Sequence, residues 1–273
     1  MSAWDAARAV EIPVERWHKA VAARTSRRVY DGRMPPEELL APLEAVCGGF
    51  RPFPGARTVL VRESPEPVFK GLIGGYGKVR GAPLYAAFIA DTPAARCREA
   101  VGYVGEAFVL EATALGLGTC WVSGFFRPGR AAAHVPLKEG ESILAVTPLG
   151  FAVEGLTFIE KRMKAFVKAE RRKPVEELVV SGSFEEPWQR TAVEAARLAP
   201  SAVNRQPWRF RLEPGAVGLE FDASGPGNVE AKRLDCGIAM LHVELGARAA
   251  GVDGRWEFLN APGIAAFRSR RVS

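Results

Sequence analysis

An internal duplication constrains the fold of this chain more than any other feature of its sequence. The stretch VGYVGEAFVLEATALGLGTCW in the first half has a counterpart, LDCGIAMLHVELGARAAGVDGRW, in the second half. Three residues of the first stretch fall on identical residues of the second at a constant offset: Gly102 on Gly237, Gly116 on Gly251 and Trp121 on Trp256. A repeat over so long a spacing indicates two copies of one domain rather than a solenoid of short repeats.

The elements before this stretch repeat in the same order. PPEELLAPLEAVCGG predicts a helix with a proline start and a glycine stop, and EEPWQRTAVEAARLAP predicts its counterpart. TVLVRE and WRFRLE predict the strand that follows each helix. We therefore expect an α+β chain whose first copy covers residues 1–180 and whose second, shortened copy covers residues 181–273. The last strand of the second copy, AAFRSRRVS, looks vestigial.

Composition is that of an ordinary globular protein. The chain has 273 residues, of which 48% are hydrophobic and 25% charged. It contains no run of about 18 apolar residues, so we expect no membrane span. The start, MSAWDAARAV, lacks the pattern of a secretion signal, and the four cysteines lack CxxC spacing, so we expect a cytoplasmic protein with reduced thiols. The three histidines lack metal-ligand spacing, and no metal site is expected.

Basic residues outnumber acidic ones, and the formal net charge is +6. They are dispersed along the chain except in EKRMKAFVKAERRK (residues 160–173), which does not favour nucleic acid as a partner. Helical spacing places Met163, Phe166 and Val167 on one face of this stretch. The pattern predicts a solvated basic helix that packs through this stripe, with an anion-binding role possible at its RRK end.

Four stretches contain groups that suit a ligand. RTSRR (residues 24–28) places guanidinium groups beside hydroxyls, which suits a phosphate, although a solvated loop has the same composition. LGLGTCWVSGF ends a buried helix in a loop with many backbone donors, and RRKP offers a second anion site. LAPSAVNRQPWRF ends a helix with several polar side chains, which either form a connecting loop or face a ligand.

Taken together and in this order, these stretches resemble the nitroreductase family of FMN-dependent oxidoreductases. The resemblance is carried by RTSRRVYDGR, APLYAAFIAD, LGLGTCWVSGF, RRKPVEELV and EAARLAPSAVNRQPWRF, and it covers most of the chain. It implies an α+β nitroreductase-like fold with a central mixed sheet flanked by helices, here present as two fused copies. Family members are ordinarily homodimers, in which one subunit gives an Arg-x-Ser-x-Arg loop and the partner gives a Pro-Ser-x-x-Asn loop to each flavin site.

In this chain the basic loop lies in the first copy and the Pro-Ser-x-x-Asn loop lies in the second. The first-copy position that matches Asn204 is Pro54, which has no amide side chain, and VVSGSF offers no guanidinium before the second copy. The resemblance therefore implies a fused dimer that keeps one complete site. We expect one FMN per chain and a monomer with an internal pseudo-dimer interface.

The resemblance also implies a role for each part of the site. The basic loop grips the FMN phosphate and the pyrimidine edge, and late basic residues reach the phosphate. Lys78 stabilises the reduced flavin near N1 and O2, although a surface lysine in a glycine turn fits equally well. The loop after the long helix lies near N5, and the second-copy loop closes the site, with Gln206 and Trp208 supporting it. The implied cofactor-binding residues are Arg24, Thr25, Ser26, Arg28, Lys78, Val122, Ser123, Gly124, Arg172, Lys173, Pro200, Ser201, Ala202 and Asn204.

The implied activity is hydride transfer from NAD(P)H through FMN to a small-molecule acceptor such as a nitroaromatic or a quinone. No side chain has to act as a nucleophile, because the protein positions two rings and tunes the flavin charge. Two alternatives stay open. The chain could be a non-catalytic flavin-binding or sensor protein, since one of two sites is lost, or it could perform another flavin chemistry such as reductive dehalogenation or flavin breakdown.

Overall fold

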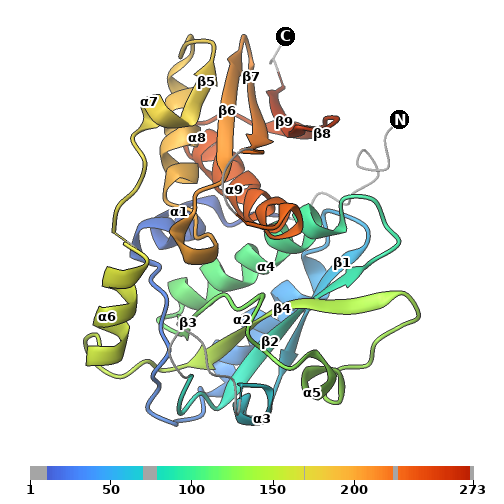
Figure 1. Cartoon of the computed structure of the whole chain (residues 1–273), viewed down its shortest axis with the longest axis vertical. Helices are drawn as coiled ribbons and strands as arrows, with labels where there is room; N and C mark the ends of the chain where they lie inside the picture. The colour runs from blue at the N-terminus through green and yellow to red at the C-terminus, as the bar shows by residue number, and fades with distance from the viewer. Residues whose placement is uncertain (1–10, 70–78, 169, 224–226, 271–273) are drawn as a thin grey trace.

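The computed structural model describes residues 11–69, 79–168, 170–223 and 227–270. Its helices and strands alternate along the chain as an α+β protein (Figure 1). The first part contains α1 (Val14–Ala23), α2 (Glu37–Gly49), β1 (Ala56–Val61), α3 (Glu66–Phe69), β2 (Leu84–Asp91), α4 (Cys97–Ala114), β3 (Gly118–Thr119), α5 (Pro128–Ala132) and β4 (Glu141–Gly150). The second contains α6 (Phe158–Phe166), α7 (Val175–Leu178), β5 (Val179–Ser181), α8 (Pro187–Arg197), the short 3-10 helix η1 (Ala202–Asn204), β6 (Trp208–Glu213), β7 (Ala216–Phe221), α9 (Val229–Ala249), β8 (Gly254–Phe258) and β9 (Gly263–Ser269).

The strands form two sheets with matching topology. The first sheet has the order β1-β2-β4-β3, and the second has the order β5-β6-β7-β9-β8. Without β5, the second order repeats the first strand for strand, which confirms the predicted pair of related copies. Each copy therefore has its own sheet, and the mixed character comes from β5, which runs parallel to β6 while the other pairs are antiparallel. Figure 1 shows the two sheets at opposite ends of the molecule, with α4 and α9 between them.

The two long helices cross in backbone contact at their matched glycines. A Cβ at Gly102 would lie 2.2 Å from the Leu234 carbonyl oxygen, and a Cβ at Gly237 would lie 2.1 Å from the Glu99 carbonyl oxygen. Leu234 and Glu99 are themselves counterparts at the offset of the repeat, so the crossing is symmetric. Only a residue without a side chain allows backbones to approach so closely.

Both long helices also end alike. Each is followed by a glycine with left-handed backbone geometry, Gly116 at φ +77° and Gly251 at φ +80°. The next matched residues, Trp121 and Trp256, each donate the indole N–H to a buried glutamate. The counterparts in the sequence are thus counterparts in the structure.

The last strand is not vestigial, and that prediction was wrong. β9 lies between β7 and β8 and pairs with both. Its residues Ile264 and Phe267 are buried in the main core, while Arg268 forms ion pairs with Glu213 of β6 and Glu257 of β8. Arg268 lies near the end of β9 and Arg270 follows it, so the apolar centre of the strand is intact, and Arg271 lies outside the described residues.

The basic helix α6 also differs from the prediction. Met163 is buried, but Phe166 is 76% exposed and does not belong to the packed stripe. The helix is turned so that Glu160, whose side chain is fully buried, faces the protein. Glu160 lies on the inner face of α6, where the apolar pattern expects a hydrophobic residue, and Phe166 lies on the outer face.

The segment between β4 and β5 carries the chain from the first sheet to the second. It contains α6 and α7 and ends in β5, which pairs with β6 of the second copy. β5 covers residues 179–181 and so lies across the expected boundary between the two copies at residue 180. The position of this boundary remains a prediction. None of the described helices is both long and apolar enough to cross a membrane.

Candidate functional site

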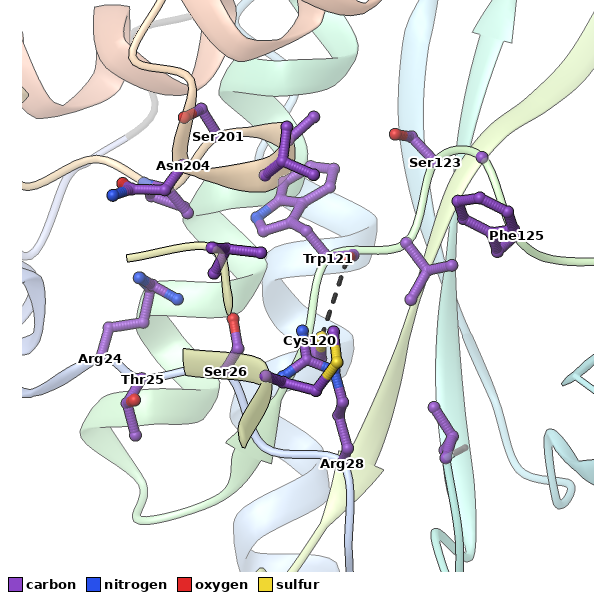
Figure 2. A pocket seen from close by; sticks show the side chains of 18 of the residues that line it. Arg24, Thr25, Ser26, Arg28, Cys120, Trp121, Ser123, Phe125, Ser201 and Asn204 are labelled. Atoms are coloured by element: carbon purple, nitrogen blue, oxygen red, sulfur yellow. Dashed lines mark hydrogen bonds between the residues drawn. The ribbon is translucent and has the colours of Figure 1, made fainter. Parts of the chain in front are cut away.

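A cavity of about 1030 Å³ lies between the two copies. Its walls come from the basic loop (residues 24–28), the loop after α4, the α6 segment, η1 and α9. Figure 2 shows Arg24 and Asn204 on one side of this cavity, with Ser123 and Phe125 on the other. Most of the residues implied by the resemblance line it: Arg24, Thr25, Ser26, Arg28, Val122, Ser123, Gly124, Arg172, Pro200, Ser201, Ala202 and Asn204.

Two implied residues are not among those that line the cavity. Lys78 lies outside the described residues. Lys173 is described, but its ammonium group forms an ion pair with Glu177 at 2.8 Å, and its backbone N–H donates to the Gln206 side chain. Arg172, its neighbour, is the basic residue that this segment presents to the cavity.

The basic loop is extended because it pairs with neighbouring strands. Ser26 bridges Thr119, and the Arg27 N–H donates to the Thr119 carbonyl at 2.8 Å. Alternate side chains of an extended segment point to opposite sides. Arg28 accordingly lines the cavity, while Arg27 turns away and donates to Glu160 and to two backbone carbonyls.

Glu160 fixes this loop from a distant part of the chain. One carboxylate oxygen accepts the Arg28 N–H at 2.8 Å and contacts the Arg27 guanidinium at 3.3 Å, and the other accepts the Thr157 N–H at 2.9 Å. Burial alone would raise the pKa of Glu160. The hydrogen bonds from the Arg28 and Thr157 backbones and the charge of Arg27 outweigh burial, and its pKa is lowered.

Among the cavity arginines, Arg24 and Arg172 are partly or largely withdrawn from solvent and have no carboxylate partner in the described part of the chain. The Arg24 Nε atom is buried and has no hydrogen-bond partner in the described part of the chain. Burial, followed by the positive charges of Arg24 and Arg197, lowers the pKa of Arg172 to about 10. An anion placed here would satisfy the buried N–H and offset the repulsion between the guanidinium groups.

The loop after α4 forms a fixed wall. Trp121 donates its indole N–H to Glu106 at 2.7 Å and packs against Phe88 at a centroid distance of 4.4 Å, with the ring planes tilted by 37°. A Cβ at Gly105 would lie 2.4 Å from the indole ring, so a glycine is required behind it. Val122 bridges Val146 of β4, which holds the start of this loop against the first sheet.

The second-copy loop has strained backbone geometry. Three residues other than glycine have positive φ angles: Val203 at 50°, Asn204 at 54° and Gln206 at 50°. Such conformations persist only where surrounding contacts impose them, and they are concentrated at functional sites. Here the contacts include the Gln206 N–H, which donates to Ser201 Oγ at 2.9 Å. Gln206 and Trp208 are buried and support the loop, in the position expected for them.

Asp235 is a cavity residue that sequence reasoning missed. It lies on α9, is 3% exposed, and accepts the Ala202 N–H with both carboxylate oxygens at 3.2 Å. Burial raises its pKa to about 7, against the lowering effect of the Ala202 hydrogen bond and the Arg205 charge. Its counterpart at the offset of the repeat is Ala100, so a carboxylate that breaks the duplicated apolar pattern is the signal that could have identified it.

An aromatic cluster of Phe53, Tyr103 and Phe258 includes residues whose counterparts in the repeat line the cavity. Tyr103 is the counterpart of the cavity residue Ile238, and Phe258 is the counterpart of Ser123. Phe53 packs edge-on against Tyr103 at 4.7 Å and lies 6.2 Å from Phe258. Aromatic rings therefore occupy the positions where the open site has Ile238 and Ser123, which have smaller side chains.

Comparisons with known proteins agree with this fold. The family model described as "Putative TM nitroreductase" matches residues 17–247. A structure from Thermotoga maritima, titled a "putative nitroreductase", aligns with a TM-score of 0.58 and 20% identity over 96% of this chain and 97% of its own. A nitroreductase family protein from Clostridium difficile 630 aligns with a TM-score of 0.44 and 20% identity over 62% of this chain and 98% of its own.

A nitroreductase with bound FMN from Desulfitobacterium hafniense aligns with a TM-score of 0.42 and 20% identity over 52% of this chain and 91% of its own. No curated protein matches the chain. The Thermotoga structure shares the fold over nearly the full length of both chains. Because the family model spans well over half of the sequence, this chain belongs to the nitroreductase family.

Proposed function

We propose that this protein is an FMN-dependent oxidoreductase that binds one FMN in the cavity between its two copies. The observation that carries the proposal is the pair of cavity arginines, Arg24 and Arg172, which have no carboxylate partner among the described residues. Together with Arg28 they make an anion site at one end of a cavity whose size is at the upper end of the range for ligand pockets, ~300–1,000 Å³.

Bound FMN would supply hydride transfer at N5. The chain's own residues would bind and orient it. Arg24 and Arg172 would hold the phosphate, and Arg28 would lie near the pyrimidine edge. The loop of residues 122–124 would form one wall along the ring, and residues 200–202 would cover the site from the second copy. Lys78 and Lys173 keep their proposed roles near N1 and at the phosphate.

NAD(P)H is the electron donor in this proposal, and a nitroaromatic or a quinone is the acceptor. Phe69, Phe125 and Val203 line the same cavity as the arginines, and Phe125 is 43% exposed. Apolar and aromatic side chains at an opening favour a flat ring over a strongly charged molecule. The free cysteines fit a reducing, cytoplasmic location, which is part of the same proposal.

The proposal is tested by the absorption spectrum of the purified protein with FMN offered in excess. Flavin bands that remain after gel filtration and bleach when NADPH is added under anaerobic conditions are expected. Flavin that is retained but never bleached by NADH or NADPH would favour the non-catalytic flavin-binding alternative. A protein that retains no flavin at micromolar concentration would exclude both.

A further inference from the structure

Both side-chain amide hydrogens of Asn204 are donated within the protein. Its amide nitrogen donates one hydrogen to the Lys168 carbonyl at 2.8 Å and the other to the Arg171 carbonyl at 2.9 Å. Its oxygen accepts from Arg172 Nη1 at 2.9 Å. A carboxamide has two hydrogens to donate, so Asn204 has none left for a bound molecule.

Arg172 is held by two acceptors on the same guanidinium nitrogen. Nη1 donates to the Ala199 carbonyl at 2.8 Å and to Asn204 Oδ1 at 2.9 Å. Within the described chain, Nε and Nη2 of Arg172 have no hydrogen-bond partner, and the residue lines the cavity. A planar guanidinium that is fixed through one nitrogen presents its remaining donors in a defined direction.

The backbone of the loop that contains Asn204 is strained, so contacts with the rest of the protein must hold it in this conformation. Asn204 has a positive φ of 54°, and its neighbour Val203 has a positive φ of 50°. The three hydrogen bonds of the Asn204 side chain lock it in this conformation and tie η1 to the segment after α6. Strain at a cavity-lining residue whose amide faces the protein indicates a role in alignment.

We propose that Asn204 is a positioning residue that aims the Arg172 guanidinium at the anionic group of the cavity occupant and does not bind that occupant with its own amide. This inference rests on the proposed function, in which the anionic group is the FMN phosphate. It assigns phosphate recognition to Arg172 with Asn204 behind it, whereas the sequence pattern alone treats Asn204 as a cofactor ligand.

Comparing FMN with riboflavin tests this role, because riboflavin has the same ring and side chain without the phosphate. Fluorescence titrations of Asn204→Ala are expected to show FMN affinity reduced about tenfold, the effect of one charge-assisted contact. Riboflavin affinity should stay within about twofold of the wild type. The Asn204→Ala, Arg172→Ala double variant should bind FMN no more weakly than Arg172→Ala alone, since both substitutions remove one coupled interaction.

Gln206→Ala provides the matched control. The Gln206 side chain contacts the Lys173 N–H at 2.8 Å and the Arg171 carbonyl at 3.1 Å, so it ties the same segment to the same loop. It makes no hydrogen bond to the Arg172 guanidinium. Loosening this tie should change the affinities for FMN and riboflavin by the same factor, and melting temperatures of all variants measured without ligand separate folding from binding.

Equal losses of FMN and riboflavin affinity in Asn204→Ala, or additive losses in the double variant, would overturn the inference while leaving the proposed function intact. A wild-type protein that binds neither flavin would overturn the proposed function. In that case inorganic phosphate still tests Asn204, because it should raise the melting temperature of the wild type more than that of Asn204→Ala. Equal shifts would then reject the positioning role.

Discussion

At the scale of single residues, Arg27 and Arg28 show how adjacent identical side chains acquire different tasks. Pairing of the basic loop with Thr119 makes it extended, so Arg28 faces the cavity while Arg27 donates to Glu160 and to the Val153 carbonyl. The alternation follows from sequence spacing once the loop is known to be extended. Sequence spacing does not identify Glu160 as the partner of Arg27, because the two residues are more than a hundred positions apart.

Substituting each arginine separates binding from folding. Arg28→Ala is expected to weaken FMN binding by about 1.5–3 kcal/mol, or roughly ten- to a hundredfold, through loss of a charge-assisted contact. Arg27→Ala is expected to lower the melting temperature more and FMN affinity less, because it removes the ion pair with the buried Glu160 and the donor to the Val153 and Gly155 carbonyls. Fluorescence titration and thermal unfolding measure the two effects. Equal losses of FMN affinity would contradict the assignment.

The raised pKa of Asp235 predicts a pH-dependent cost in stability. Its pKa rises from 3.8 in the unfolded chain to about 7 in the fold, so the folded state binds more protons between these values. The contribution of Asp235 to the free energy of unfolding is therefore most favourable below pH 3.8. It declines as the pH rises and is fully lost above pH 7. Asp235→Asn keeps an acceptor for the Ala202 N–H and removes the titration.

Denaturation of Asp235→Asn and of the wild type across this pH range measures the effect. The variant should be more stable at pH 8, by up to about 4 kcal/mol, and the difference should shrink towards pH 4. A difference that does not change with pH would show that Asp235 stays charged throughout.

At the scale of secondary structure, α4 and α9 cross with their backbones in direct contact at Gly102 and Gly237. Gly102→Ala would place a methyl group against the Leu234 carbonyl, which belongs to a helix backbone and cannot move aside alone. We expect it to lower the free energy of unfolding by about 1–3 kcal/mol or more. Gly48→Ala is the control, because Gly48 lies in α2 with open space around it and should gain about 0.5–1 kcal/mol. Urea denaturation compares them, and similar values for both would argue against the tight crossing.

The sequence predicted the major elements and the duplication because these depend on local pattern. The long helices, their glycine ends and the strand after each helix all came from residue spacing. Features that depend on tertiary contact were missed. α6 was given the wrong buried face because Glu160 is satisfied by a distant loop, and β5 was missed because three residues become a strand only when β6 lies beside them.

The structure brings most of the predicted site residues together around one cavity, and their role in cofactor binding remains a prediction. Residues in the two loops with distinctive composition line the cavity, because those loops contain the donors that an anion requires. Asp235 was missed, and Asn204 has a different set of partners from the one its motif suggested. Whether a polar side chain faces a ligand or the protein depends on its neighbours in the folded structure. The spacing of residues in the sequence does not identify these neighbours.

At the scale of the whole molecule, the aromatic cluster supports the prediction of a single cofactor site per chain. Phe53, Tyr103 and Phe258 pack together where a second cofactor would need space, and Arg96 covers Phe258 at 4.5 Å. We predict one FMN per chain in a functional monomer. Sedimentation gives the mass of the active species, and flavin released on denaturation gives the ratio. Two flavins per chain, or activity that disappears on dilution, would contradict this prediction.

The symmetric crossing of α4 and α9 also has a consequence for sequence divergence, because its two sides belong to one chain. In an assembly of two identical chains, every substitution at the interface is made twice, so a change that improves one face is imposed on the other. In this chain the two faces are encoded separately. Asp235 could therefore arise without altering Ala100, and Tyr103 could arise without closing the cavity at Ile238. Because the two copies are fused in one chain, each half of the interface can accept substitutions that the other half does not share.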